Sequence, residues 1–179
     1  MLAKLVLLAF AALSPLTSAA VIRRAPGIRP VAVSPRQGTS PSIGLASIVN
    51  NCNETVHIWS VGQNIAGPFN INRGGVYAEQ FTRDPVSGGK ALKLTLIPNG
   101  IFNGAAQTIF AYNLDGTGKI WYDLSDVFGN AFTGRKLVVT SADPTCPTIT
   151  FPNGVPPGGS QVKVCPDASK DVTLTLCAA

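Results

Sequence analysis

The 179-residue sequence predicts an all-β domain, either a sandwich or a barrel. Apolar and polar residues alternate in several short runs, as at Leu92, Leu94 and Leu96, and this period of two is typical of strands with one solvated face. Gly, Pro and Asn separate these runs, and no amphipathic helix pattern interrupts them. Of the four cysteines, Cys52 opens the first strand-like run and Cys177 lies near the end of the sequence.

The first twenty residues have the organisation of a secretory signal peptide. Lys4 precedes the apolar run Leu5–Leu13, and small residues follow at positions 18–20. The apolar run is too short to span a bilayer, which takes roughly 20 residues. We therefore expect a secreted protein with no membrane span, from which residues 1–20 are removed. The pair Arg23-Arg24 is either a second processing site or simply two solvated charges.

Residues 21–44 are predicted to be a disordered arm or propeptide, because positions 25–42 are rich in Pro, Ser, Gly, Arg and Gln and hold no aromatic residue or acid. The formal net charge of +5 comes from cations that all lie before Gln37. The rest of the chain is neutral, so the alkaline isoelectric point gives no support for nucleic-acid binding, which needs a basic face on the folded part.

Residues 45–179 have the length of one domain. β-branched and aromatic runs predict strands at Thr55–Trp59 and Lys119–Tyr122, and alternation predicts others at Leu92–Leu96 and Val172–Leu176. Turn signals lie between the runs, at Asn72–Gly75, Ser87–Gly89, Pro98–Gly100, Asp115-Gly116 and Pro156–Gly159.

Four cysteines allow three pairings, and spacing alone cannot choose among them. Cys146 and Cys165 flank a turn-rich stretch, so a local bridge between them is the economical choice, and it leaves Cys52 with Cys177. A zinc site would need clustered CxxC-type spacing, which is absent, and a secreted protein favours oxidised cysteines. We expect no metal and no cofactor.

Several blocks of the sequence resemble the fungal yeast-phase-specific proteins, also called antigenic thaumatin-like proteins. These blocks are Asn50–Trp59, Gly88–Lys93, Leu114–Phe128, Pro152–Cys165 and Leu174–Cys177. The resemblance covers nearly all of residues 47–179. It implies a thaumatin-like antiparallel β-sandwich stapled by two disulfides, in which the first cysteine pairs with the last. It also implies a secreted or wall-associated fungal protein of antigen or effector type, in a family with no settled biochemical activity.

Catalysis is disfavoured by the residues that stand at the family's acidic cleft. Thaumatin-like proteins with β-1,3-glucan activity carry paired carboxylates there, as glycoside hydrolysis requires. Ala111 stands where the resemblance places the cleft glutamate, and Ile120 stands where it places an aspartate. Asp123 is retained with Asp126 close by, and we expect both to bind backbone amides near a turn. A weak β-1,3-glucan hydrolase using Asp123 is the second hypothesis. An antimicrobial protein is the third, although the neutral domain counts against it.

Binding is the favoured function, and Trp59, His57 and Asp123 are the candidate carbohydrate-binding residues. His57 and Trp59 point to the face opposite their strand neighbours, so an exposed Trp59 would stack on a sugar ring. The alternative is that these aromatic side chains pack in the core. Trp121 and Tyr122 point to opposite faces, so one of them is also expected at the surface.

The only N-glycosylation sequon is Asn53-Glu54-Thr55, which predicts a glycan at Asn53. The expected partners are cell-wall polysaccharide or a host surface, with no nucleic acid, and the protein is expected to be a monomer.

Overall fold

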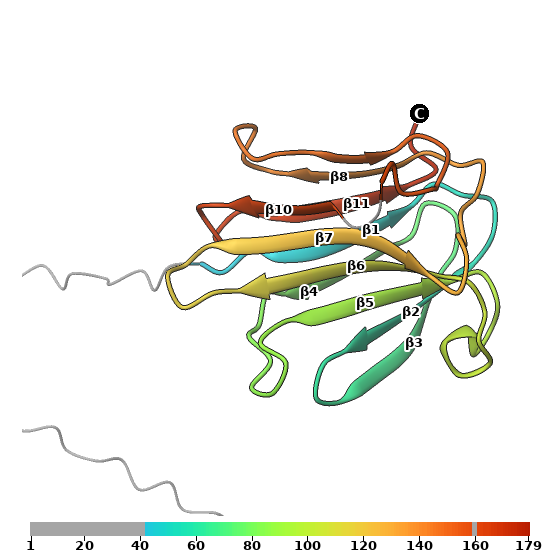
Figure 1. Ribbon diagram of the computed structural model, residues 1–179, viewed down its shortest axis with the longest axis horizontal. Helices are drawn as coiled ribbons and strands as arrows, with labels where there is room; N and C mark the ends of the chain where they lie inside the picture. The colour runs from blue at the N-terminus through green and yellow to red at the C-terminus, as the bar shows by residue number, and fades with distance from the viewer. Residues whose placement is uncertain (1–41, 159–160) are drawn as a thin grey trace, which may run out of the picture. The chain divides into compact units, whose positions relative to one another are not determined.

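The computed structural model describes residues 42–158 and 161–179, which form two stacked β-sheets (Figure 1). The five-stranded sheet has the order β4 (Val76–Gln80), β1 (Leu45–Asn50), β11 (Val172–Leu176), β8 (Leu137–Ser141) and β9 (Ile149–Phe151). The six-stranded sheet has the order β10 (Gln161–Cys165), β7 (Ile120–Val127), β6 (Gln107–Leu114), β5 (Lys90–Thr95), β2 (Val56–Val61) and β3 (Ile65–Ile71). The 3₁₀ turn η1 (Gly100–Phe102) lies between β5 and β6.

The expected all-β sandwich is confirmed. The expected signal peptide at 1–20 and residues 21–41 of the expected arm lie outside the described residues. Gly44, at the end of that arm, belongs to the folded part: it is buried, its N–H donates to Ala168 and its carbonyl accepts from Phe81. Within the described part, no helix has the length and apolar character needed to cross a membrane.

One strand pair departs from the antiparallel expectation. β1 and β11 run parallel, with Ile48 opposite Leu174. Because parallel strands finish at the same edge of a sheet, Cys52 after β1 and Cys177 after β11 arrive together, with their Cα atoms 5.1 Å apart. The parallel pair thus explains why the first and last cysteines form a disulfide.

The second disulfide joins Cys146, in the loop after β8, to Cys165 at the end of β10, with Cα atoms 5.2 Å apart. β8 belongs to the five-stranded sheet and β10 to the six-stranded sheet, so this disulfide staples the two layers. Both expected pairings are therefore present in the structure.

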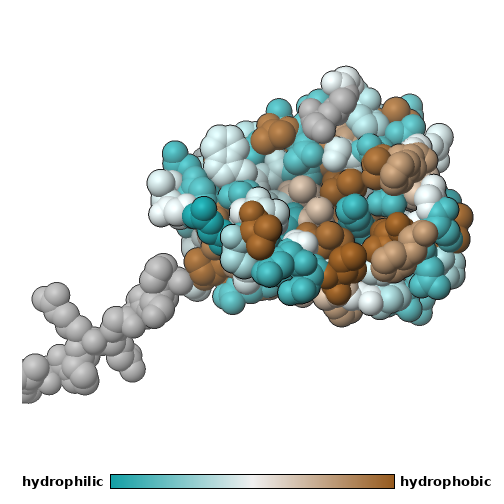
Figure 2. Space-filling model, turned by 60° about the horizontal axis from the view of Figure 1, so that its bottom comes forward, coloured by the Kyte–Doolittle hydropathy of each residue, from teal (hydrophilic) through white to brown (hydrophobic). Residues whose placement is uncertain are grey.

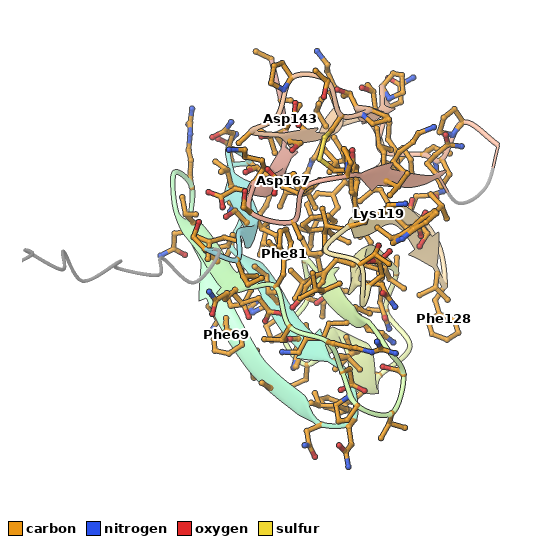
Figure 3. All side chains as sticks on the ribbon, turned by 90° about the vertical axis from the view of Figure 1, so that its left-hand side faces the viewer. Phe69, Phe81, Lys119, Phe128, Asp143 and Asp167 are labelled. Atoms are coloured by element: carbon orange, nitrogen blue, oxygen red, sulfur yellow. A yellow bond between two sulfur atoms is a disulfide. The ribbon has the colours of Figure 1, made fainter. Side chains whose placement is uncertain are left out.

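The core fills the space between the sheets. Its fully buried side chains include the alternating residues that marked two strands in the sequence: Leu92 and Leu94 in β5, and Val172, Leu174 and Leu176 in β11. Burying each such aliphatic side chain contributes about 1.5–3 kcal/mol. Phe81 lies inside the molecule in Figure 3, whereas Phe69 lies at its margin.

Several large apolar side chains remain at the surface. Figure 2 shows brown patches in the middle and right of the view, separated by polar side chains. Phe102 is 67% exposed and Phe128 is 69% exposed, both in loops that follow strands of the six-stranded sheet. The outward face of that sheet, opposite the core, is the part of the fold that positions the candidate site.

Candidate functional site

A groove of about 430 Å³ lies on the outward face of the six-stranded sheet. Its floor is made by Ala91 of β5 and Ala111 of β6, which are opposite each other in register. Ala111 in turn lies opposite Asp123 of β7. Two adjacent alanines leave a depression because larger residues lie around them. The remaining lining residues are Val61, Gly62, Ser87, Gly89, Lys90, Tyr112, Asn113, Trp121, Tyr122 and Val162.

Asp123 lies in this groove as the sequence-based hypothesis requires. It is half-buried, and its Oδ1 is buried with no hydrogen-bond partner among the described residues. A buried carboxylate oxygen without a donor is energetically costly, so this oxygen has unmet capacity to accept a hydrogen bond.

Trp121 supplies an exposed aromatic surface beside Asp123. Its side chain is 41% exposed and lines the groove, while Tyr122 is buried, so the expectation that one of the two reaches the surface is confirmed. The indole N–H donates to Asp115 Oδ2 over 3.2 Å. This hydrogen bond anchors one edge of the ring and leaves its apolar surface for packing against a ligand.

Asp115 is itself held in the β6–β7 turn. Its Oδ1 accepts from the hydroxyl and the backbone N–H of Thr117, each over 2.8 Å, and from the backbone N–H of Lys119 over 3.0 Å. The hydrogen bond from the Thr117 hydroxyl and those from the backbone keep the pKa of Asp115 well below its usual range. Asp115 is thus a charged anchor for the Trp121 ring.

Asp84 fixes the loop that borders the other side of the groove. It is only 6% exposed, and its carboxylate accepts from the backbone N–H of Gln63, Val86 and Ser87 over 2.7–3.0 Å and from the Ser87 hydroxyl over 2.9 Å. These bonds, led by the one from Gln63, lower the pKa of Asp84 to about 2. From the sequence, Asp84 is one of two acids, with Glu79, that would have to face Asp123 across a cleft in a hydrolase, and its oxygens are instead occupied by its own loop.

The hypothesis that Trp59 is an exposed carbohydrate-binding residue is wrong, and the alternative, that its side chain packs inside the protein, holds. Trp59 is fully buried on the outward side of β2, where Phe102 of η1 lies edge-on to it with ring centroids 6.4 Å apart. Gly67 of β3 adds to the cover, because a Cβ at that position would lie 3.1 Å from Trp59 Cδ1. The alternation of β2 gives the correct face, but a loop from elsewhere covers that face. Trp59 does not line the groove.

His57 also lies away from the groove. It is half-buried on β2, opposite Asn70 of β3, and its Nδ1 lies 2.6 Å from the amide oxygen Oδ1 of Asn70. Because the amide oxygen only accepts, the imidazole N–H donates. Of the three candidate carbohydrate-binding residues, only Asp123 lies in the groove.

Asp123 and Asp126 do not act together. Both belong to β7, where an odd separation places them on opposite faces. Asp126 accepts from the Thr108 hydroxyl over 2.5 Å, and burial raises its pKa. The expectation that the two aspartates bind backbone amides near a turn is therefore wrong, because the whole segment is strand.

A hydrolase would need a second carboxyl group near Asp123, from either Glu79 or Asp84. Glu79 lies on β4 in the five-stranded sheet and accepts hydrogen bonds from the hydroxyls of Tyr77 and Tyr112. Lys90 Nζ lies 3.6 Å from Glu79 Oε1. Glu79 does not line the groove, so Asp123 is the only carboxylate among the described groove residues.

The structure also locates the predicted glycosylation site and the residues that could bind a metal. Asn53 is exposed in the loop between β1 and β2, where its Oδ1 accepts from Arg73 over 3.0 Å. Among the described residues, the cluster of potential metal ligands is Asp143, Cys146 and Cys165. Its two sulfurs form a disulfide and are not available as thiolate ligands.

The sequence and the fold both match known proteins. Residues 36–178 match the family model described as Blastomyces yeast-phase-specific protein. The chain belongs to this family. An antigenic thaumatin-like protein of Arthroderma benhamiae is 24% identical over 147 residues, which cover 76% of this chain and 72% of that protein.

The family's fold is also seen in solved structures. The protein elicitor MoHrip2 from Magnaporthe oryzae superposes with a TM-score of 0.62 at 21% identity, covering 75% of this chain and 99% of the elicitor. The thaumatin-like xylanase inhibitor TLXI gives a TM-score of 0.47 at 14% identity, covering 74% of this chain and 99% of the inhibitor. The family that the sequence blocks imply is confirmed, and the elicitor shares the fold of this chain.

Proposed function

We propose that the protein works outside the cell as a non-enzymatic binding protein for cell-wall or host-surface polysaccharide. The observation that carries this proposal is the exposed Trp121 ring, which lines the groove together with the carboxylate residue Asp123. A sugar ring offers an apolar C–H face that packs on an indole and hydroxyl groups that donate to a carboxylate. The alanine floor gives the ring room between them.

The groove has too few acids for hydrolysis by two carboxylates. Glycoside hydrolysis uses a pair of carboxyl groups about 5–9.5 Å apart, one as acid and the other as nucleophile or base. Asp123 is the only carboxylate lining the described groove, Asp84 is saturated by backbone donors, and Asp126 faces away. This arrangement supports binding without turnover.

An extracellular location fits the two disulfides, because such bonds persist in oxidising compartments. The relative in Arthroderma benhamiae carries the name of an antigen, which agrees with a protein presented outside the cell. We propose that the mature protein starts after residue 20 or after Arg24. N-terminal sequencing of secreted material tests this, and an intact Met1 on membrane-retained protein would contradict it.

Binding to insoluble polysaccharide tests the function directly. Purified protein is mixed with insoluble β-1,3-glucan or chitin, and both the bound fraction and the released reducing ends are measured. We expect binding with no release of reducing ends, and Trp121→Ala should weaken binding about tenfold because a ring-stacking contact is worth roughly 1–1.5 kcal/mol.

Phe128→Ala is the matched control, because Phe128 is also an exposed aromatic residue but lies outside the groove. It should bind as the wild type does. If the amount of reducing ends released rises with the concentration of the protein, the non-enzymatic proposal is overturned. Equal binding by wild type and Trp121→Ala would show that the groove is not the binding site.

A further inference from the structure

We infer that the groove binds an internal stretch of a straight, neutral, β-1,4-linked sugar chain that lies across the strands. This inference rests on the proposed function, and it names the ligand class of the same site. It follows from the register of the strands that make the groove floor.

One row of side chains crosses the six-stranded sheet at the groove. Val61 of β2 lies opposite Ala91 of β5, which lies opposite Ala111 of β6. Ala111 lies opposite Asp123 of β7, which lies opposite Val162 of β10. All five residues line the groove, and Figure 1 shows β7, β6, β5 and β2 side by side in this order. The groove therefore runs across the strands.

The row is long enough for several sugars. Its ends, Val61 and Val162, are four strand spacings apart, which is about 19 Å at roughly 4.8 Å per spacing. One pyranose unit of an extended chain is about as long as one such spacing, so the row has room for about four sugars.

Both ends of the row reach solvent. Val162 is 60% exposed on β10, which is one edge strand of the sheet. At the other end, Val61 lies opposite Ile65 of β3, the other edge strand, and Ile65 is 54% exposed. A bound chain can therefore continue past both edges of the sheet, so the groove has no need of a chain end.

The lining favours a chain without charge. It contains one acid, Asp123, and one base, Lys90, so neither sign of charge prevails in it. Asn113 and Trp121 lie opposite each other in register and also line the groove. The indole packs on the apolar face of a sugar, and the amide of Asn113 donates to hydroxyl groups and accepts from them. These are contacts that a neutral sugar uses in full.

The shape of the row selects the linkage between the sugars. Residues that are opposite each other in successive strands follow a nearly straight line across a sheet. A β-1,4-linked chain is an extended ribbon and follows such a line. A β-1,3-linked chain curves into a helix and leaves the line. We therefore expect a preference for neutral β-1,4-linked chains, the linkage of chitin.

The test measures affinity against chain length by calorimetry, with the full secreted protein and β-1,4-linked glucose oligomers of two to six units. We expect affinity to rise about tenfold from the disaccharide to the tetrasaccharide, because each added sugar brings its own hydrogen bonds, and then to level off. The β-1,3-linked hexasaccharide should bind no better than the β-1,4-linked disaccharide. A bulky group on the reducing end of the β-1,4-linked hexasaccharide should leave its affinity unchanged.

Ala111→Leu places a larger side chain at the middle of the row. It should remove the dependence of affinity on chain length, because only short parts of the row stay free. Ser125→Leu is the matched control: Ser125 lies on the same face of β7 as Asp123, outside the lining, and the variant should keep the length dependence. Thermal unfolding checks that both variants are folded.

Three results would overturn this inference and leave the proposed function standing. They are full affinity for the disaccharide, a length dependence that persists in folded Ala111→Leu, and a preference for the β-1,3-linked oligomer. Failure of every oligomer to bind also overturns the inference. The proposed function falls with it only if insoluble chitin and β-1,3-glucan are not bound either.

Discussion

The side-chain amide of Asn50 donates to the backbone carbonyl of Ile71 over 2.9 Å, which ties β1 of the five-stranded sheet to the end of β3 in the six-stranded sheet. The same amide donates to the carbonyl of Glu54 over 2.9 Å, and its oxygen accepts from the N–H of Cys52 over 2.9 Å. Asn50 is fully buried. It therefore organises the loop that carries the first disulfide cysteine.

Asn50→Ala should destabilise the protein by about 3 kcal/mol, because two backbone carbonyls and one N–H lose their partner in a buried position. Urea unfolding of both proteins measures this difference. Asn51→Ala is the matched control, since Asn51 is the exposed neighbour, and its effect should stay within about 0.5 kcal/mol. Equal stability of the two variants would contradict the assigned role of Asn50.

The two disulfides should differ in their contribution to stability. The bond between Cys52 and Cys177 closes a separation of 125 residues, and the bond between Cys146 and Cys165 closes one of 19 residues. In the chain-entropy model, replacing both cysteines of the long-range disulfide by serine lowers the free energy of unfolding by about 5 kcal/mol. The same change in the short-range disulfide lowers it by about 3 kcal/mol. Thermal and urea unfolding of the two double variants tests the order, and the reverse order would contradict it.

The stability of the protein should fall in acid, with Asp84 as one cause. Hydrogen bonds led by the one from the Gln63 N–H hold its folded-state pKa at about 2, below roughly 3.9 for an unfolded aspartate. Between these values the unfolded state binds more protons, so the stabilisation from Asp84 is fully present above about pH 4 and is lost as pH falls toward 2. Urea unfolding across this range should show a shallower decline for Asp84→Asn, and parallel curves would contradict the assignment.

Asn53 should carry an N-linked glycan in protein secreted from a eukaryotic host, because the sequon lies in an exposed loop. Enzymatic deglycosylation should lower the mass, and Asn53→Gln should abolish that shift. The loop precedes β2, whereas the groove begins at Val61 at the far end of that strand, roughly 20 Å away. Removing the glycan should therefore leave polysaccharide binding unchanged. An Asn53→Gln protein of wild-type mass would contradict the modification.

The sequence predicted the fold well because its signals are local. Alternation at Leu92 and Leu94 marks one face of a strand as buried, wherever the strand lies in the sheet. Both side chains are fully buried in the structure, so this prediction is confirmed. The order of strands is a long-range property, and local alternation says nothing of it. The parallel pairing of β1 with β11 could therefore not be read from either strand.

The candidate site was predicted only in part, for a related reason. Alternation placed Trp59 on the correct face, but it carries no information on the loop with Phe102 that covers that face. The groove depends on Ala91, Ala111 and Asp123 standing side by side, which follows from the register of three strands. Asp123 was identified through a family motif, and the neighbouring residues that make it part of a groove emerged only from the structure.

The position of β11 has a consequence for the newly made chain. β1 is the first strand of the domain to be synthesised and β11 is the last, yet they are neighbours, and β11 is the middle strand of its sheet. Until β11 emerges, one edge of β1 lacks its partner and β8 lacks the strand that joins it to β1. Such long-range pairing is slow to form. The five-stranded sheet is therefore completed only once β11 has been made, and a nascent chain that lacks β11 holds no finished sandwich.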